Sequence, residues 1–221
     1  DDSLKNFQKE HNLTIFHLMG QHVNYKLRYR TKQARFWASS YEDKRPELTD
    51  AQRKMLSHYD NATLYNDSIV AQIVKRFQKQ DAIVIYVPDH GEECYEENRG
   101  FICRNHSAEI DWPLAHYEFE IPFWIYCSPK YIRNHRDIYR QIRKAKDKRF
   151  MTDALPHLLL YLAGIETPTY KEEYNILSPK YDEMRPRILK NSADYDKLRD
   201  AHLEKIKKEE SKKVKKKERR N

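Results

Sequence analysis

Apolar runs typical of strands alternate along the chain with stretches whose apolar residues recur at helical spacing. Residues 13–18 (LTIFHL), 82–87 (AIVIYV) and 119–127 (FEIPFWIYC) predict strands. Between the first two runs, a capping-box pattern at residues 49–52 opens a helical stretch that extends to about residue 80. This order of strand, helix and strand predicts a βαβ unit whose two strands run parallel.

The last third of the chain contains a shorter helical pattern and a polar end. A helix is predicted over residues 153–163, capped by Thr152 and closed by Gly164. After it the apolar pattern fades, which is typical of a solvated helix or of disorder. We therefore expect a folded part, residues 1–190, and a polar, basic tail, residues 191–221.

Polar residues that suit a metal follow the central strand directly. Pro88 cannot donate to a sheet ladder and ends the strand, and Asp89, His90, Gly91 and Glu92 come next. Open α/β sheets place their ligands at the carboxyl ends of strands. Asp and His suit a divalent metal such as zinc, whereas the alternative is an Asp that caps a turn and a loop histidine. Two adjacent ligands do not complete a site, so others must come from elsewhere.

Further histidines lie in comparable places. His22 follows residues 13–18 across Gly20, and the polar loop after the central strand contains His106 and His116. We expect His157, on the predicted helix, to be structural. A zinc ion among these donors would polarise a phosphoryl oxygen and activate a hydroxyl nucleophile. The set favours transfer or hydrolysis of phosphate or sulfate esters over acyl transfer, and the sequence has no GxSxG elbow and no P-loop motif.

The positive charge of the chain is concentrated at one end. The formal net charge is +8, and residues 205–220 contain ten Lys or Arg against three Glu. The rest has a net charge of only +1, which argues against a nucleic-acid groove. The aromatic and basic segment 25–41 resembles a nucleic-acid platform in isolation, but we favour a loop that rims an anionic substrate site. The basic end is either a solvated tail or a contact for anionic lipid.

Membrane and disulfide signals are sparse. No run of about 18 apolar residues predicts a membrane span, and the polar N-terminus is not a signal peptide. In an oxidising compartment Cys94 and Cys103 are expected to close a small loop, with two thiols as the alternative. Cys127 lies in an apolar strand and is expected to be a buried thiol.

Four segments of the chain together resemble a known family. They are LTIFHLMGQH, SHYDNATLYNDSIVAQIV, IVIYVPDHGEE and FEIPFWIYCS, and they extend over about residues 13–165. Their order and spacing are similar to those of the phosphoethanolamine transferases, which are membrane-anchored, periplasm-facing members of the alkaline phosphatase/sulfatase superfamily. The resemblance implies a three-layer α/β/α sandwich with a mostly parallel central sheet, present here in part.

The resemblance also implies roles for individual residues. Asp89 and His90 match the zinc-binding pair of the family, and Glu92 is a candidate for a second metal or its surroundings. His22 and His106 match histidines that lie near the phosphate group, the match of His106 being the weaker because its loop varies in length. Where the family has glycine and proline after the first histidine, this chain has valine and asparagine at positions 23–24.

The implied activity is the zinc-dependent transfer of phosphoethanolamine from phosphatidylethanolamine to lipid A or another cell-envelope glycan. The threonine nucleophile would lie outside this chain, upstream, together with the membrane region that would hold the enzyme in the bacterial inner membrane, facing the periplasm. This chain alone is therefore expected to be inactive. The alternatives are a sulfatase or phosphodiesterase on the same fold and a non-catalytic binding module. A binding module has no reason to retain zinc.

Overall fold

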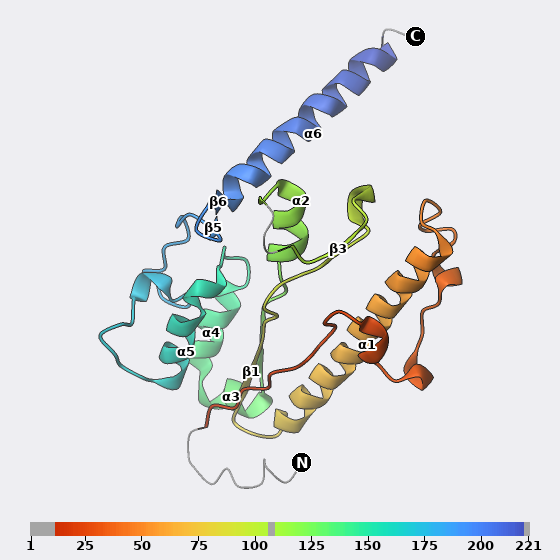
Figure 1. Ribbon diagram of the computed structural model, residues 1–221. Coiled ribbons are helices and arrows are strands. Elements are labelled where there is room, and N and C mark those ends of the chain that lie inside the picture. The colour runs from red at the N-terminus through yellow and green to blue at the C-terminus, as the bar shows by residue number, and fades with distance from the viewer. Residues whose placement is uncertain (1–11, 106–108, 219–221) are drawn as a thin grey trace. The chain divides into compact units, whose positions relative to one another are not determined.

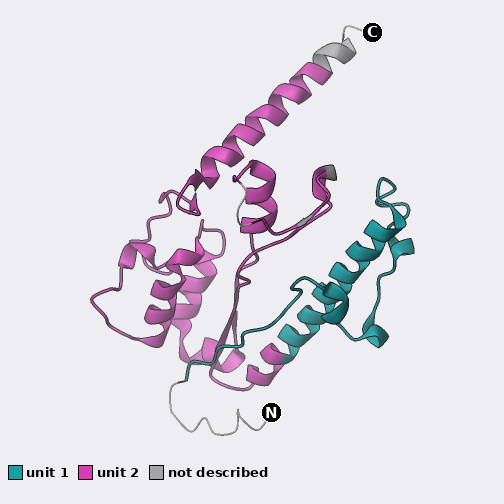
Figure 2. Cartoon of the chain, viewed as in Figure 1, with its two compact units in different colours: residues 1–72 teal, residues 73–221 magenta. Residues whose placement is uncertain are grey.

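The computed structural model describes residues 12–105 and 109–218, and the chain divides into two compact units, residues 1–72 and 73–221 (Figures 1 and 2). The first unit contains short 3-10 helices and most of the long helix α1, whose last turn belongs to the second unit. Their bounds are η2 (Tyr25–Leu27), η3 (Thr31–Gln33), η4 (Ala38–Tyr41) and α1 (Asp50–Phe77).

The second unit contains short strands, helices and one π-helical turn. The strands are β1 (Ile83–Tyr86), β2 (Glu93–Cys94), β3 (Phe101–Cys103), β4 (Trp124–Cys127), β5 (Ile188–Leu189) and β6 (Ala193–Asp194). The α-helices are α2 (Trp112–Leu114), α3 (Pro129–Asn134), α4 (Arg136–Ala145), α5 (Leu155–Ala163) and α6 (Tyr195–Glu218). The π-helical turn is η6 (Ala115–Phe119), and the 3-10 turns are η5 (Glu96–Asn98), η7 (Thr152–Ala154) and η8 (Glu172–Tyr174).

Helix α1 begins as its sequence predicts and fixes the segment before it. The Thr49 backbone N–H donates to Gln52 Oε1 at 2.8 Å and the Gln52 N–H donates to Thr49 Oγ1 at 3.4 Å, which together form the expected capping box. About three turns into the helix, buried Asn61 accepts from the backbone N–H groups of Arg35 and Phe36 at 2.6 and 3.1 Å. Its amide also donates to the Phe36 carbonyl at 2.8 Å. Asn61, which lies in one of the segments that resemble the family, thus holds the preceding loop against α1.

The core of the second unit lies beside an antiparallel pair of strands. β1 pairs with β4, so that Ile83 faces Cys127 and Tyr86 faces Trp124. Buried residues of α4, α5 and the following loop pack together, and partly buried residues of β4 cover this cluster. The buried members are Ala145, Leu158, Ile176 and Leu177. Gly164 ends α5 with a left-handed backbone (φ +65°), as the sequence predicts.

Two expectations about strands are corrected. Residues 13–18 form no strand, because Leu13 and Ile15 are 72% and 80% exposed and no described strand offers them a ladder. The parallel βαβ unit is therefore absent from the described residues, whose strand pairs are all antiparallel. The segment between β1 and β4 leaves and returns at the same end of the pair, which makes β4 run opposite to β1.

Other boundaries also differ from the sequence pattern. The strand expected over residues 119–127 is confined to β4, since η6 extends to Phe119 and Pro122 lacks the N–H that a ladder needs. Most of the basic tail forms α6, the solvated helix of the two alternatives. None of the helices that the structure describes is long and apolar enough to cross a membrane.

Candidate metal centre

His90, directly after β1, has a tautomer fixed by its two neighbours. Its Nδ1 lies 2.7 Å from the Gly91 carbonyl oxygen, which can only accept a hydrogen bond. Its Nε2 lies 2.8 Å from Nη1 of Arg104, which can only donate. Both contacts require the neutral ring with its proton on Nδ1 and its lone pair on Nε2. A backbone carbonyl that accepts from one ring nitrogen is the arrangement typical of metal-binding histidines.

Asp89 offers a second donor beside this lone pair. Its Oδ2 lies 3.7 Å from His90 Nε2, and its side chain is 88% exposed, whereas that of His90 is 16% exposed. The two residues therefore fit as one nitrogen and one oxygen ligand of a zinc ion. Within residues 12–105 and 109–218, no group of three or more His, Cys, Asp or Glu side chains is arranged to hold a metal. Among the described residues, this pair alone therefore does not complete a metal centre.

Gly91 anchors the loop to the π-helical turn η6. Its N–H donates to the Glu118 carbonyl at 2.8 Å. A Cβ at this position would lie 2.2 Å from the carbonyl oxygen of Tyr117. The glycine is thus required by this close approach of two backbone segments, not by a positive φ. The buried Glu118 side chain accepts in turn from the Asn105 N–H at 2.7 Å, which ties the loop after β3 to the same turn.

The hairpin β2–β3 supports the other side of the loop. Glu93 is fully buried and accepts from Arg99 Nε at 2.6 Å, and Arg99 also reaches Asp111 at 2.7 Å. Burial raises the pKa of Glu93 above its usual value, although the Arg99 guanidinium opposes this. Burial also acts to raise the pKa of Asp111, but the N–H of Leu114 and the Arg99 guanidinium together lower it.

The two cysteines of this hairpin are thiols, contrary to the expected disulfide. The register offsets them, because Cys103 faces Glu93 and Cys94 faces Phe101. The Cys103 thiol instead lies 3.8 Å from Glu92 Oε1, to which it donates. Glu92 therefore contacts the hairpin in this structure. Cys127 is only partly buried, and burial raises its pKa.

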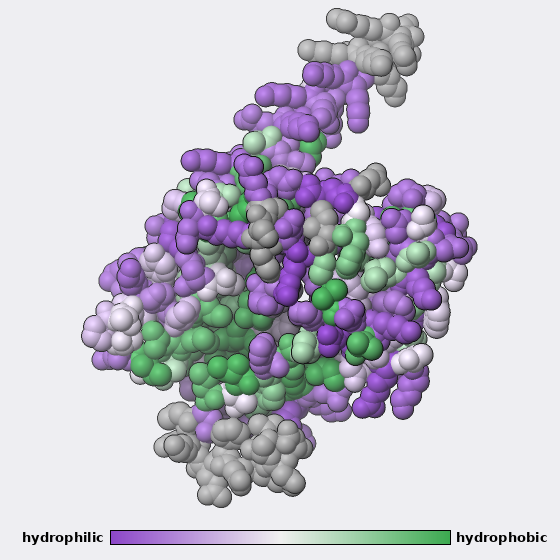
Figure 3. All heavy atoms as spheres, in the orientation of Figure 1, coloured by the Kyte–Doolittle hydropathy of each residue, from purple (hydrophilic) through white to green (hydrophobic). Residues whose placement is uncertain are grey.

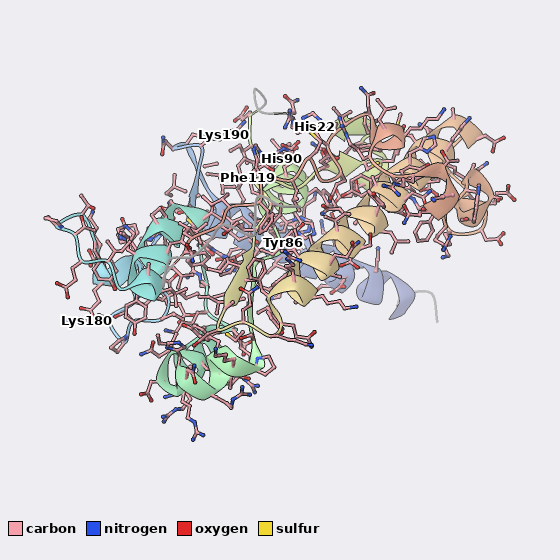
Figure 4. The ribbon with its side chains drawn as sticks, turned by 90° about the horizontal axis from the view of Figure 1, so that it is seen from below. His22, Tyr86, His90, Phe119, Lys180 and Lys190 are labelled. Carbon is pink, nitrogen blue, oxygen red and sulfur yellow. The ribbon has the colours of Figure 1, made fainter. Side chains whose placement is uncertain are left out.

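Asp89 and His90 open into a large cavity of the second unit. Its volume is about 1190 Å³, and Phe119 lines it together with His90 (Figure 4). The cavity wall is polar near Asp89 and His90 and becomes more apolar where β4 and α4 line it. Figure 3 shows hydrophobic residues gathered over the region that α4, α5 and β1 occupy in Figure 1. Basic side chains also line it, namely Arg104, Arg143, Lys146, Lys148, Arg149, Arg187 and Lys190.

His22 belongs to the first unit, where a turn holds it. Its N–H donates to the Met19 carbonyl at 3.2 Å, and Gly20 has a positive φ of 53°. Arg28 donates to the carbonyl oxygens of His22 and Val23 at 2.9 and 3.1 Å. A turn therefore follows residues 13–18 although they form no strand. His106 lies outside the described residues, so its predicted role stays a prediction.

The other histidines have structural contacts. His116, the other histidine predicted in the loop of His106, stacks on Trp112 with ring centroids 5.4 Å apart. His157 accepts from the Lys171 N–H at 3.1 Å, in line with its expected structural role. Sequence reasoning missed Arg104 and Glu118. The one sequence signal for Arg104 as a site residue is its position two residues before His106.

Comparisons with known proteins agree with an α/β fold of the sulfatase type. The chain belongs to the sulfatase family, whose model matches residues 1–165. Within that family it is similar to the phosphoethanolamine transferase EptC of Escherichia coli O18:K1:H7 (strain RS218 / NMEC), with 32% identity over 77% of this chain and 29% of that protein. It is also similar to the Kdo(2)-lipid A phosphoethanolamine 7''-transferase of Escherichia coli K12, with 31% identity over 62% of this chain and 23% of that protein. The resemblance to phosphoethanolamine transferases is thereby confirmed.

A solved structure has a matching fold. The C-terminal periplasmic domain of EptC from Escherichia coli, in complex with zinc, aligns with a TM-score of 0.64 and 28% identity over 81% of this chain and 50% of that domain. The chain thus spans less than a third of the curated relatives and about half of the solved domain. The alkaline phosphatase/sulfatase-like α/β class expected from the sequence is confirmed at this level.

Proposed function

We propose that this chain forms part of the catalytic domain of a zinc-dependent phosphoethanolamine transferase of the bacterial envelope. Asp89 and His90 are the two zinc ligands that it contributes. The observation that carries the proposal is the Nδ1–H tautomer of His90, which presents the Nε2 lone pair beside a carboxylate. Family membership and similarity to a zinc-bound periplasmic domain support it.

The reaction moves phosphoethanolamine from phosphatidylethanolamine to a threonine hydroxyl, which releases diacylglycerol, and then to lipid A or another envelope glycan. Zinc would supply polarisation of the phosphoryl oxygen and a lower pKa for the nucleophile. Asp89 and His90 hold their donor atoms toward the cavity. Arg104 is placed to pair with a phosphoryl oxygen, since a guanidinium suits phosphate geometry. His22 and His106 are proposed to bind the phosphate group, and Glu92 to support a second metal.

Several parts of this proposal concern regions beyond the described residues. The threonine and the remaining zinc ligand would lie in the part of the domain that this chain does not span. That part would also extend the β1–β4 pair into the mostly parallel sheet of a three-layer α/β/α sandwich, in which one antiparallel pairing is tolerated. Attachment to the inner membrane, with the catalytic domain in the periplasm, belongs to the same proposal.

The test measures zinc affinity of the chain by competition with a chromophoric chelator. The double variant Asp89→Ala/His90→Ala removes the proposed ligands. The double variant Asp81→Ala/His135→Ala is the matched control, because it removes another Asp–His pair of the second unit, with Nε2 and Oδ1 3.3 Å apart. We expect zinc binding to be lost only in the first. Equal zinc binding by the two variants would refute the metal assignment.

Activity requires the whole catalytic domain. In that protein, the same two double variants are compared for diacylglycerol release from phosphatidylethanolamine and for phosphoethanolamine attached to lipid A. Loss of both products in Asp89→Ala/His90→Ala, with both retained in the control, is the expected result. If the wild-type whole domain bound zinc but formed neither product, the transferase assignment would be excluded and another reaction of the sulfatase family would be favoured.

A further inference from the structure

Helix α6 is anchored at its first turns and exposed along the rest. Tyr195 is buried, and Leu198 packs on the same apolar cluster of Ile110 and Leu114. His202 stacks on Trp112 with ring centroids 5.1 Å apart. Every residue from 203 to 213 is exposed, which agrees with the projection of α6 from the rest of its unit in Figure 1. The exposed half of the helix therefore has no contact surface in its own unit.

Nearly all the net charge of the protein lies in the sequence from the middle of α6 to the end of the chain. Residues 205–220 have ten basic and three acidic side chains, whereas the remaining chain is almost neutral. With 100° between successive residues, the apolar stripe of Tyr195, Leu198, His202 and Ile206 continues only into Glu209 and Lys213. The described lysines, which are Lys205, Lys207, Lys208, Lys212 and Lys213, are thus distributed around the helix, and the part of α6 that Figure 3 colours is mainly hydrophilic. Such a helix has no face for insertion or for a coiled coil.

The chemistry of this surface fits a plane of negative charge. A helix with its side chains is about 10–12 Å thick, and the Debye length at physiological salt is about 8 Å. Lysines on the near side and the flanks therefore interact with the same charged plane. Eight of the ten basic residues are lysines, which act as point charges without the fork that reads base edges. A nucleic acid would also need basic residues on the neighbouring elements, whereas the rest of the chain is nearly neutral.

The anchored end of α6 lies at the candidate site. Tyr195 lines the cavity into which Asp89 and His90 open, and its hydroxyl donates to Glu120, which lines the same cavity. We propose that α6 is an electrostatic membrane anchor, which docks on the phosphate headgroups of anionic phospholipids and holds this cavity near the membrane surface. The proposal goes beyond the transferase assignment and does not depend on it, because docking is measured without zinc or turnover.

The experiment measures binding of the purified chain to vesicles by co-sedimentation. Phosphatidylcholine vesicles that contain one third phosphatidylglycerol are compared with pure phosphatidylcholine. The α6 variant carries Lys205→Gln, Lys207→Gln, Lys208→Gln, Lys212→Gln and Lys213→Gln. Glutamine has a helix propensity close to that of lysine, and circular dichroism verifies that α6 persists. The control removes five exposed charges from α3 and α4 instead: Lys130→Gln, Arg133→Gln, Arg136→Gln, Arg140→Gln and Lys144→Gln.

One lysine near an anionic surface raises affinity about fivefold, and two or three of the five face the plane at once. We therefore expect the α6 variant to bind anionic vesicles about 30- to 100-fold more weakly, the control to bind within about threefold of wild type, and salt to weaken wild-type binding. Equal loss in both variants, or equal binding to neutral vesicles, would overturn the proposal. Tighter binding to a DNA duplex than to anionic vesicles at the same salt would overturn it in favour of a nucleic acid.

Discussion

Gly91→Ala should damage the candidate site through backbone geometry alone. The added Cβ would lie 2.2 Å from the Tyr117 carbonyl oxygen and 3.4 Å from Glu118 Cα. Ordinary contact requires the two segments to separate by about 1 Å, which also breaks the 2.8 Å hydrogen bond from Gly91 to the Glu118 carbonyl. Overpacking and this lost bond together lower the free energy of unfolding by about 2–4 kcal/mol.

The same displacement moves the carbonyl that orients the His90 ring. Because the orienting partners of a metal ligand are worth about 10- to 100-fold in affinity, zinc should bind at least about tenfold more weakly. Urea unfolding and chelator competition measure the two effects. Gly164→Ala is the control, since its φ of +65° costs about 1 kcal/mol but no atom lies within 4 Å of the new Cβ. This control should lose stability and keep its zinc affinity.

Two results would refute this reasoning. A Gly91→Ala variant within about 0.5 kcal/mol of wild type would show that η6 does not approach Gly91 so closely. A clearly destabilised variant with unchanged zinc affinity would show that zinc binding does not depend on the Gly91 carbonyl as the group that orients the His90 ring. The comparison with Gly164→Ala separates this second result from a general loss of stability.

Three further variants test individual contacts. Arg104→Gln removes the guanidinium that competes for the His90 Nε2 lone pair, so zinc affinity should rise about tenfold, and weaker binding in chelator competition would contradict this. Asp196→Asn should lower urea stability by about 2–4 kcal/mol at neutral pH, because Arg149 and Arg187 both donate to this carboxylate. These arginines lower the pKa of Asp196 in the folded protein. The contribution of Asp196 to the free energy of unfolding is therefore complete above the unfolded pKa of about 3.9 and is lost as the pH falls through the folded pKa. The difference in stability between wild type and variant should accordingly close in acid. Asn61→Ala removes three hydrogen bonds to the loop before α1 and should cost about 2–3 kcal/mol, whereas unchanged proteolysis of that loop would count against this role of Asn61.

The sequence predicted the local features well because nearby residues determine them. The cap of α1 depends on residues 49–52, the end of α5 on Gly164, and the break after β1 on Pro88 and the polar residues behind it. The direction of β4 was not predictable in this way, since it depends on how the whole segment between the two strands returns. The run 13–18 shows the related limit: its pattern indicates a strand, but a strand needs a partner.

In the candidate site too, features that depend on neighbouring residues were predictable, whereas features that depend on distant segments were not. Asp89 and His90 were identifiable because they are adjacent and follow an apolar run. Arg104 and the Glu118 carbonyl were not, because both reach the loop through the hairpin and η6. The close approach that requires Gly91 was not predictable either, because η6 makes it. The roles of His22, His106 and Glu92 stay predictions.

The contacts around His90 separate two properties that a metal site usually combines. On its Nδ1 side, the ring is oriented by the Gly91 carbonyl and, behind it, by the Glu118 carbonyl of η6. Much of the cavity lining that does not contact His90 comes from β4 and α4, together with basic side chains such as Lys146 and Arg187. Changes in that lining should therefore alter which substrate fits while zinc affinity stays constant. Changes in the packing of η6 should weaken zinc binding more than they alter which substrate fits. The metal site therefore depends on the exact packing of η6 more than on that of the other elements.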